Sequence, residues 1–332
     1  MEHALDKGLQ PVIAGRNPST IESMARFYGL EWKTAQVDDS EQLRDLTATA
    51  TILLNAAGPF ALTSAPIIDA CIDTRTHYLD IAGEAAVIQA ASEWDKDARR
   101  RGTMIMPGVG FEVVASDCLA AYVAEQLPDA VSLKIGFDKS FPTSLGSIKN
   151  TIEMSGKGAL LRRDGWILSV PSGPQISYFD YGHGPQPSVS CSFGDVCTAF
   201  FSTGIPNVET YMRATLPVLG LVVADQFWGW LTASPAMQSF LKSQADMFGR
   251  NPTPDERADG WGVLVAEARD ANGKCVSARM NTGDVYTFTA QSAVGVAEMC
   301  LAGNLRPGFH TPSQLYGPDF AMLFEGTFRE DL

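Results

Sequence analysis

The sequence predicts an α/β fold, in which a doubly wound parallel sheet is followed by a second, largely antiparallel α+β domain. From residue 7 to about residue 128, short apolar runs alternate with amphipathic stretches of helical spacing, a pattern typical of parallel βαβ units. From residue 131 to about residue 288, strand-like segments are separated by loops rich in Gly, Pro and Ser. We therefore place a dinucleotide-binding domain at 1–130, completed by 290–332, and an α+β substrate or dimerisation domain at 131–289.

The first domain contains five predicted strands, each followed by a helix. The strands are expected at 10–15, 31–37, 50–58, 76–83 and 103–110, and the helices at 17–30, 40–48, 64–74, 85–101 and 116–127. Asn17, Ser40 and Ser116 are the expected N-caps, because their residue types accept hydrogen bonds from the first free N–H groups of a helix. The near-continuous apolar run at 50–58 indicates a strand that is covered on both faces.

The second domain is predicted from short strand segments and one hairpin. Strands are expected at 131–138, 146–156, 165–171, 188–195, 262–270, 275–281 and 285–290. Asn272 and Gly273 predict the hairpin turn, since both residue types tolerate positive φ angles. A final helix is expected at 290–303.

Composition excludes several classes of function. The chain of 332 residues has a net charge of -13 and a single short basic cluster at 98–102, so it lacks the basic face that nucleic acid requires. Its six cysteines have no CxxC spacing and its histidines are far apart, so we expect no metal site and a cytoplasmic location. The longest apolar run, 216–231, contains Asp225 and is too short for a membrane span.

The first strand of a doubly wound sheet is missing from this pattern. That strand lies at the centre and carries the glycine-rich turn that holds a pyrophosphate, yet only nine residues of helical character precede the strand at 10–15. Each buried, unsatisfied backbone group costs about 1–3 kcal/mol, so a full unpaired strand would exceed the roughly 5–15 kcal/mol stability of a typical protein. We expect either that Met1 is not the native start or that the flanking second and fourth strands pair directly.

Four ordered motifs, "AGRN", "LLNAAGPF", "HYLDIAGE" and "PGVGFEVVASDCLA", resemble those of the saccharopine dehydrogenase-like oxidoreductases, which include trans-acting enoyl reductases. The resemblance continues through "GIPNVETY", "NPTPDER" and "LRPGFHTPSQLYGPDF", and it covers nearly all of the chain. It implies a Rossmann-like domain, NADP as cofactor with NAD as the alternative, and reduction of a C=C or C=N bond of a small or acyl substrate. The chain departs from the family in lacking the glycine-rich loop and in having Ala115 before "SD", where proline is usual. We therefore expect weak cofactor binding or none by the chain as it stands.

The candidate cofactor-binding residues follow the ends of the predicted strands. They are Arg16, Asn17, Asp38, Asn55, Ala56, Ala57, Gly58, Pro59, Gly108 and Gly110. An arginine after the second strand accommodates the 2′-phosphate of NADP, whereas an acid there would bind the ribose hydroxyls of NAD. Small residues at 56–58 allow the backbone to approach a nicotinamide ribose. The structural alternatives are a surface arginine, a helix cap at Asn17, a loop acid at Asp38 and an ordinary strand-to-helix turn at 55–59.

Tyr78 and Asp80 are the candidate catalytic residues. Two positions apart on a strand, they point to the same face, and such a pair can supply a proton when hydride reaches a double bond. The alternative is that Asp80 caps the next helix while Tyr78 packs under the sheet.

A second class of function stays open. The missing loop also fits a truncated, non-catalytic relative that binds a metabolite or a partner, with a lipid surface as one such partner. A small-molecule ligand and a homodimer are expected under either hypothesis.

Overall fold

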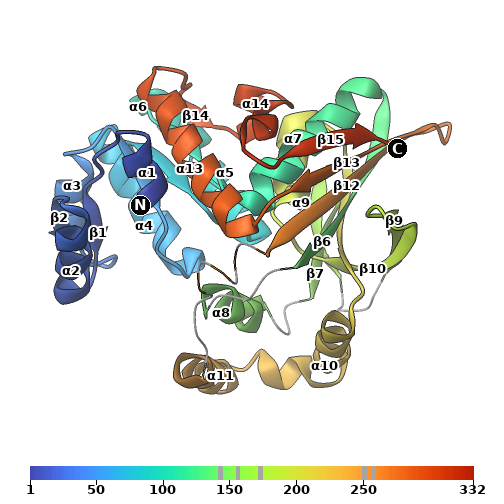
Figure 1. Cartoon of the computed structure of the whole chain (residues 1–332), viewed down its shortest axis with the longest axis horizontal. Helices are drawn as coiled ribbons and strands as arrows, with labels where there is room; N and C mark the ends of the chain where they lie inside the picture. The colour runs from blue at the N-terminus through green and yellow to red at the C-terminus, as the bar shows by residue number, and fades with distance from the viewer. Residues whose placement is uncertain are drawn as a thin grey trace. The chain divides into compact units, whose positions relative to one another are not determined.

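The computed structural model describes residues 1–140, 145–154, 158–170, 175–248, 253, 255, 257 and 259–332. The motif "NPTPDER" lies mostly outside these residues. The chain divides into two compact units (Figure 1). Unit 1 comprises Met1–Ala82, Ala86–Gly110 and Thr289–Thr311, and unit 2 comprises Gly83–Ala85, Phe111–Phe288 and Pro312–Leu332.

Unit 1 is an α/β unit whose paired strands run parallel. Its strands are β1 (Ile13–Gly15), β2 (Trp32–Thr34), β3 (Ile52–Asn55), β4 (His77–Asp80), β5 (Met104–Met106) and β14 (Gly308–Phe309). The helices are α1 (Glu2–Asp6), α2 (Pro18–Tyr28), α3 (Ser40–Thr47), α4 (Phe60–Thr74), α5 (Ala85–Ser92), α6 (Asp95–Arg101) and most of α13 (Val285–Leu301). The predicted α/β class, with strand and helix in alternation from β1 to β5, is confirmed.

The strands of unit 1 form two separate sheets. β1 pairs with β2, and the other four strands follow the order β14-β5-β4-β3. Ile13 lies opposite Trp32, and Leu53 lies opposite Tyr78. Within residues 1–140, all of which are described, β1 does not pair with β3. β1 pairs with β2, and β3 pairs with β4. The expected alternative in which β1 and β3 pair directly is therefore not observed.

Unit 2 is built on one large mixed sheet. Its strands are β6 (Ala130–Ser140), β7 (Ala159–Arg163), β8 (Trp166–Val170), β9 (Ile176–Asp180), β10 (Pro185–Cys191), β11 (Asn207–Arg213), β12 (Trp261–Asp270), β13 (Cys275–Thr282) and β15 (Phe328–Asp331). The helical segments are α7 (Phe111–Gln126), α8 (Leu145–Met154), α9 (Asp195–Thr203), α10 (Leu216–Thr232), α11 (Pro235–Phe248), α14 (Pro312–Tyr316) and the 3-10 turn η1 (Phe320–Leu323). The main path of the sheet is β15-β13-β12-β6-β11-β10-β9, and β6 and β11 run parallel within an otherwise antiparallel arrangement.

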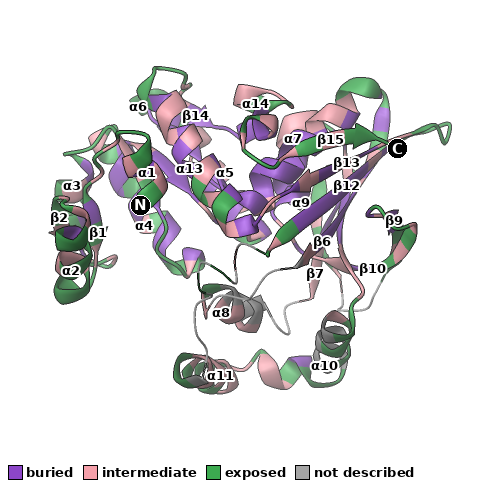
Figure 2. Cartoon of the chain, in the orientation of Figure 1, coloured by how far each residue is buried: buried purple, intermediate pink, exposed green. Residues whose placement is uncertain are grey.

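Helix α7 covers one face of this sheet, where it packs against β12 and β13 (Figure 2 shows the buried residues in purple). Leu264, Ala266 and Met280 are fully buried on that face. This packing places α7 in unit 2, whereas the predicted boundary at 130 assigned it to the first domain. The segment 312–332 also belongs to unit 2, since β15 pairs with β13, and only the part up to Thr311 completes unit 1.

Two predicted strands are helices in the structure. Residues 285–290 begin α13, because the carboxylate of Asp284 accepts hydrogen bonds from both the N–H and the hydroxyl of Thr287 and so caps the helix. Residues 146–154 lie in α8, where Ile148 and Ile152 have helical spacing. The hairpin predicted at Asn272 and Gly273 is confirmed by the antiparallel pairing of β12 with β13.

Two predicted N-caps are wrong, and one is confirmed. Asp39, not Ser40, caps α3 by accepting the N–H groups of Glu41 and Gln42. Ser116 lies inside α7, and its hydroxyl donates to the carbonyl of Glu112 one turn earlier. Asn17 caps α2 as predicted, with Gly29 in the left-handed conformation at the other end.

Candidate functional site

Three loops of unit 1 follow the carboxyl ends of β3, β4 and β5, which are parallel neighbours. Their strand ends therefore meet at one edge of the sheet, where open α/β sheets bind ligands. This edge is the candidate site, and the sequence-predicted residues at 55–59, Tyr78, Asp80, Gly108 and Gly110 come together there.

Buried side chains hydrogen-bond the backbone of the loop after β3, while residues 56–58 of the loop are exposed. Asn55 is buried, and its side-chain oxygen accepts the N–H of Ala57 at 2.9 Å. The hydroxyl of Thr63 donates to the carbonyl of Ala57 at 2.6 Å. Ala56, Ala57 and Gly58 are exposed, and a Cβ added at Gly58 would meet nothing within 4 Å. The backbone here is therefore both fixed in shape and accessible to a ligand.

Asp80 is the centre of the hydrogen-bond network at this edge. One carboxylate oxygen, Oδ1, accepts the N–H of Ala82 and the N–H of Gly108, each at 2.9 Å. The other, Oδ2, accepts the hydroxyl of Tyr78 at 2.7 Å and lies 3.5 Å from the hydroxyl of Ser64. One side chain thus ties the loop after β4 to the loop after β5.

Tyr78 and Asp80 form a hydrogen bond in the interior of unit 1. Both side chains are 0% exposed. Burial raises the pKa of the Tyr78 hydroxyl well above its usual range, and the Asp80 carboxylate adds to this shift. Burial also raises the pKa of Asp80, against the hydrogen bonds from Gly108, Tyr78 and Ala82. The Tyr78 hydroxyl therefore stays protonated at neutral pH and donates a hydrogen bond to Asp80. Both residues thereby position the loops. Direct proton transfer from either one to a substrate stays a prediction.

Gly108 and Gly110 are buried in the loop after β5. Gly108 has a φ of 70°, and its N–H is one of the two donors to Asp80. A Cβ added at Gly110 would lie 3.0 Å from the side chain of Thr289. Their positions explain why the loop needs glycine, while their predicted contact with a cofactor stays a prediction.

Arg16, Asn17 and Asp38 lie together on the smaller sheet of unit 1. Arg16 follows β1 and is exposed, and its carbonyl accepts a hydrogen bond from the side chain of Gln36, which follows β2. Asn17 is engaged as the cap of α2, and Asp38 is exposed beside the cap residue of α3. The structure thus brings Arg16 and Asp38 to the same sheet edge.

Sequence reasoning missed an ion pair in unit 2. The Nζ atom of Lys139 lies 2.5 Å from a carboxylate oxygen of Glu112, and the lysine side chain is only 11% exposed. The ammonium also lies over the rings of Phe193 and Phe111, at 5.3 Å and 6.0 Å from their centroids. The Lys139 side chain is thus held between a carboxylate and two aromatic rings. Lys139 and Glu112 are 27 positions apart, so no local spacing indicates the pair.

A second missed group, Asp195, is fully buried at the start of α9. Its carboxylate oxygens make no hydrogen bond of ordinary geometry among the described residues, although the nearby Ser116 hydroxyl lowers its pKa. Burial raises its pKa well above the usual range, and the nearby carboxylates of Asp117 and Glu112 raise it further. The folded chain therefore keeps a proton on Asp195 over a pH range in which an exposed aspartate is ionised.

No group of three or more His, Cys, Asp or Glu side chains that could hold a metal ion occurs in the part of the chain that the structure describes.

The parallel strands and the loops at their carboxyl ends define unit 1 as a Rossmann-like, dinucleotide-binding type of α/β unit. Residues 2–106, which contain β1 to β5, match the family described as the saccharopine dehydrogenase NADP binding domain. This segment thus resembles the NADP-binding domain of the saccharopine dehydrogenases, and the resemblance predicted from the motifs is confirmed.

Individual relatives match over part of the chain. A probable mitochondrial saccharopine dehydrogenase-like oxidoreductase of Arabidopsis thaliana is 26% identical over 42% of this chain and 34% of its own length. A trans-acting enoyl reductase of Mycobacterium ulcerans is 25% identical over 34% of this chain and 28% of its own length. The matched segments thus span about a third of these curated relatives or less.

Among solved structures, apo saccharopine dehydrogenase (L-Glu forming) from Saccharomyces cerevisiae superposes with a TM-score of 0.63. The alignment covers 98% of this chain and 94% of that chain at 11% identity. At this identity the likeness shows the fold alone, and it confirms the predicted fold class.

The buried acid in unit 2 gives a pH-dependent prediction. The folded chain holds a proton on Asp195 that the unfolded chain releases above its ordinary pKa, so native stability falls as pH rises toward the raised pKa. Asp195→Asn cannot release this proton, so its stability should not fall with pH for this reason. We compare the free energies of unfolding of the variant and the unaltered chain by urea denaturation. The difference should move in favour of the variant by about 1 kcal/mol from about pH 5 to about pH 8. Asp117→Asn is the control. Asp117 accepts a hydrogen bond from the N–H of Ser313 at 2.8 Å, so this substitution should lower the free energy of unfolding at both pH values. A pH-independent difference for Asp195→Asn would contradict the assignment.

The Asp80 network gives a second prediction. Tyr78→Phe removes the 2.7 Å donor to Asp80 and one partner of Asn55, so the free energy of unfolding should fall by about 1–3 kcal/mol. Tyr122→Phe is the matched control, because the hydroxyl of Tyr122 donates to Asp331 at an exposed site and its loss should cost less than about 0.5 kcal/mol. Equal costs in thermal or chemical denaturation would show that Tyr78 does not hold the loops.

Proposed function

We propose that this chain is an NADPH-dependent oxidoreductase that reduces a C=C or C=N bond of a small or acyl substrate. The observation that carries this proposal is the match of residues 2–106 to an NADP-binding family over the strands whose ends form the candidate site. The resemblance to trans-acting enoyl reductases supports a double bond as the target, and the name of one relative is consistent with it.

The residues at the candidate site fit part of such a cofactor. Arg16 follows β1, is exposed, and has no side-chain hydrogen bond or ion pair among the described residues, so its guanidinium is available for a 2′-phosphate. The exposed backbone at Ala56–Gly58 suits the approach of a ribose. We therefore propose NADP as the cofactor of this site, and titration calorimetry with NADPH measures its affinity.

When bound, NADPH supplies a hydride, and the residues of this chain position the partners. Asp80 fixes two loops through the N–H groups of Ala82 and Gly108, so the polar atoms at the sheet edge are set before a ligand arrives. Tyr78 and Asp80 are the proposed proton donors, and the Tyr78 hydroxyl hydrogen-bonds Asp80 Oδ2. Both side chains are buried, which separates their proton from solvent.

Arg16→Ala tests the assignment of the cofactor. Loss of a charge-assisted hydrogen bond to phosphate costs about 1.5–3 kcal/mol, so NADPH affinity should fall roughly tenfold or more while NADH affinity changes little. Titration calorimetry with each dinucleotide measures this. Arg26→Ala, a change at an exposed arginine of α2 that is paired with Glu22, is the matched control and should alter neither affinity. Equal losses for NADPH and NADH would count against phosphate recognition by Arg16.

The surface of α10 favours a second candidate function, in which the chain docks on a lipid surface. Its exposed apolar side chains, called here the α10 surface, are Leu216, Leu219, Val223, Phe227, Trp228 and Trp230. Trp230 is 77% exposed and Phe227 is 67% exposed. Tryptophan and phenylalanine on one apolar helix suit the boundary between headgroups and acyl chains. None of the helices in the described ranges combines the length and hydropathy needed to cross a bilayer.

The lipid proposal predicts binding to uncharged vesicles. A chain with a net charge of -13 is repelled by anionic lipid, so vesicles of phosphatidylcholine are the appropriate probe. Replacing Trp228 and Trp230 by serine should reduce co-sedimentation at least about fivefold, since each buried aromatic contributes more than 1 kcal/mol. Trp166→Ser is the control, because Trp166 is 75% exposed but lies on β8. Absence of binding by the unaltered chain, or an equal loss in the control, would refute lipid docking by α10.

A further inference from the structure

The large sheet of unit 2 has a second face that α7 does not cover, and that face is hollowed. Along each strand the side chains alternate, so Asp138, Val263, Arg279 and Asn281 point away from the residues under α7. Phe179 and Tyr181, from β9 and the turn after it, cover part of this face and pack with Val263 and Val265. Beside them lies a pocket of about 420 Å³, a volume within the range of small-molecule sites.

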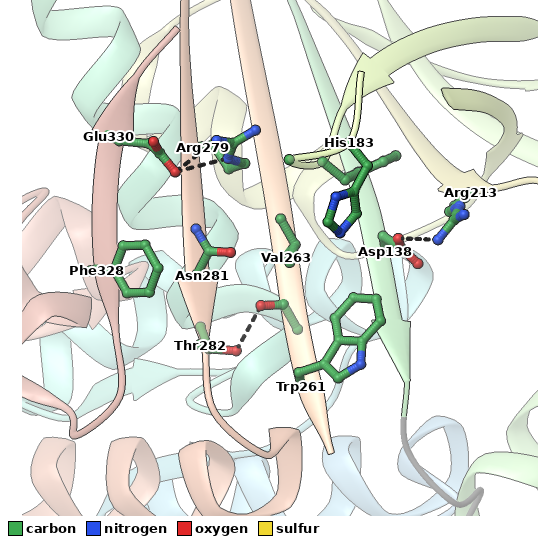
Figure 3. A pocket seen from close by; sticks show the side chains of 13 residues that line it. Asp138, His183, Arg213, Trp261, Val263, Arg279, Asn281, Thr282, Phe328 and Glu330 are labelled. Carbon is green, nitrogen blue, oxygen red and sulfur yellow. Dashed lines mark hydrogen bonds and ion pairs between the residues drawn. The ribbon is translucent and has the colours of Figure 1, made fainter. Parts of the chain in front are cut away.

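The floor of the pocket is a row of residues in register across four strands. Val263 lies opposite Asp138 on one side and Asn281 on the other, and Asn281 lies opposite Phe328. Figure 3 shows this row, with His183 and Trp261 close to it. Since neighbouring strands are about 4.8 Å apart, Asp138 and Asn281 lie about 10 Å from each other. An apolar centre therefore separates two polar ends.

The two arginines of the pocket differ in how completely they are paired. Arg279 donates through Nε to Glu330 at 2.9 Å and through Nη1 to the carbonyl of Asp180 at 3.1 Å. Arg213 makes one hydrogen bond, from Nη1 to the buried carboxylate of Asp138 at 2.7 Å, and its side chain is 36% exposed. A guanidinium carries five donor hydrogens, so most of those on Arg213 have no partner among the described residues. Arg279 is thus structural, whereas Arg213 retains donors for a ligand.

Two further polar side chains at the pocket have no partner in the described part of the chain. They are the amide of Asn281 and the imidazole of His183. Trp261 is 37% exposed and offers the flat face of its indole beside them. Unpaired donors and an aromatic wall around one concavity are the features by which proteins recognise small ligands that are partly charged and partly flat.

We propose that this pocket binds a small organic anion in which a carboxylate is joined to a flat, apolar body. The carboxylate pairs with the free donors of Arg213, the apolar body lies on Val263 against Trp261, and Asn281 hydrogen-bonds the far end. The site lies entirely within unit 2, so binding does not require a dinucleotide and stands apart from the proposed reductase activity.

Three probes separate the parts of this recognition: benzoate, benzamide and acetate. Saturation-transfer NMR and titration on the full chain should show benzoate binding at least about tenfold more tightly than benzamide, which lacks the charge, or acetate, which lacks the flat body. Addition of NADPH should leave these affinities unchanged. Equal binding of benzoate and benzamide, or no binding of benzoate, would overturn the proposal.

Variants then locate the site. Arg213→Gln leaves the buried carboxylate of Asp138 unpaired, so it is combined with Asp138→Asn to keep a neutral hydrogen-bonded pair. This double variant and, separately, Trp261→Leu should each weaken benzoate binding at least about fivefold. Arg269→Gln, at an exposed arginine also on β12, is the control and should bind as the unaltered chain does. An equal loss in the control would contradict the site. A change from dimer to monomer in light scattering without a loss of benzoate binding would assign the face to self-association instead.

Discussion

The buried carboxylate of Asp80 fixes the geometry of the candidate site. A charge or polar group taken out of water costs several kcal/mol unless hydrogen bonds replace those with solvent. At Asp80 they are replaced by two backbone N–H groups from different loops and one phenol hydroxyl. Because those donors come from the segments after β4 and β5, satisfying this one side chain determines the path of both loops. The shape of the sheet edge is therefore a consequence of satisfying Asp80.

Asp195 is also a buried aspartate, but it has fewer hydrogen bonds than Asp80. Its carboxylate oxygens make no hydrogen bond of ordinary geometry among the described residues, so the neutral form is favoured. Asp117, also fully buried, is satisfied by the N–H of Ser313 and the hydroxyl of Ser202. These three aspartates thus differ in their hydrogen bonds, and burial raises the pKa of both Asp80 and Asp195. The charge of Glu112, the partner of Lys139, adds to the raised pKa of Asp195.

Periodicity in the sequence predicts the elements of unit 1 well because each strand there is a short apolar run and each helix has its own cap or stop. It fails at residues 285–290, where aromatic and β-branched residues imitate a strand but Asp284 supplies a cap. The gathering of residues 55–59, Asp80 and Gly108 at one edge is predictable from strand order alone. The contact of Asp80 with Gly108 and the Lys139–Glu112 pair are not, since they join residues 28 and 27 positions apart and depend on side-chain packing.

The mixed sheet of unit 2 explains how one chain can offer a second ligand site. A sheet has two faces, and α7 stabilises only one of them by burying residues such as Leu264 and Met280. On the other face, the β9 hairpin places Phe179 and Tyr181 directly over Gly136, where a Cβ would lie 2.6 Å from the Tyr181 hydroxyl. This cover extends to Val263, and Tyr181 lines the pocket together with Asp138, Val263 and Asn281. Asp138, Arg213 and Asn281 belong to strands that pair in register, whereas His183 lies in the turn between β9 and β10.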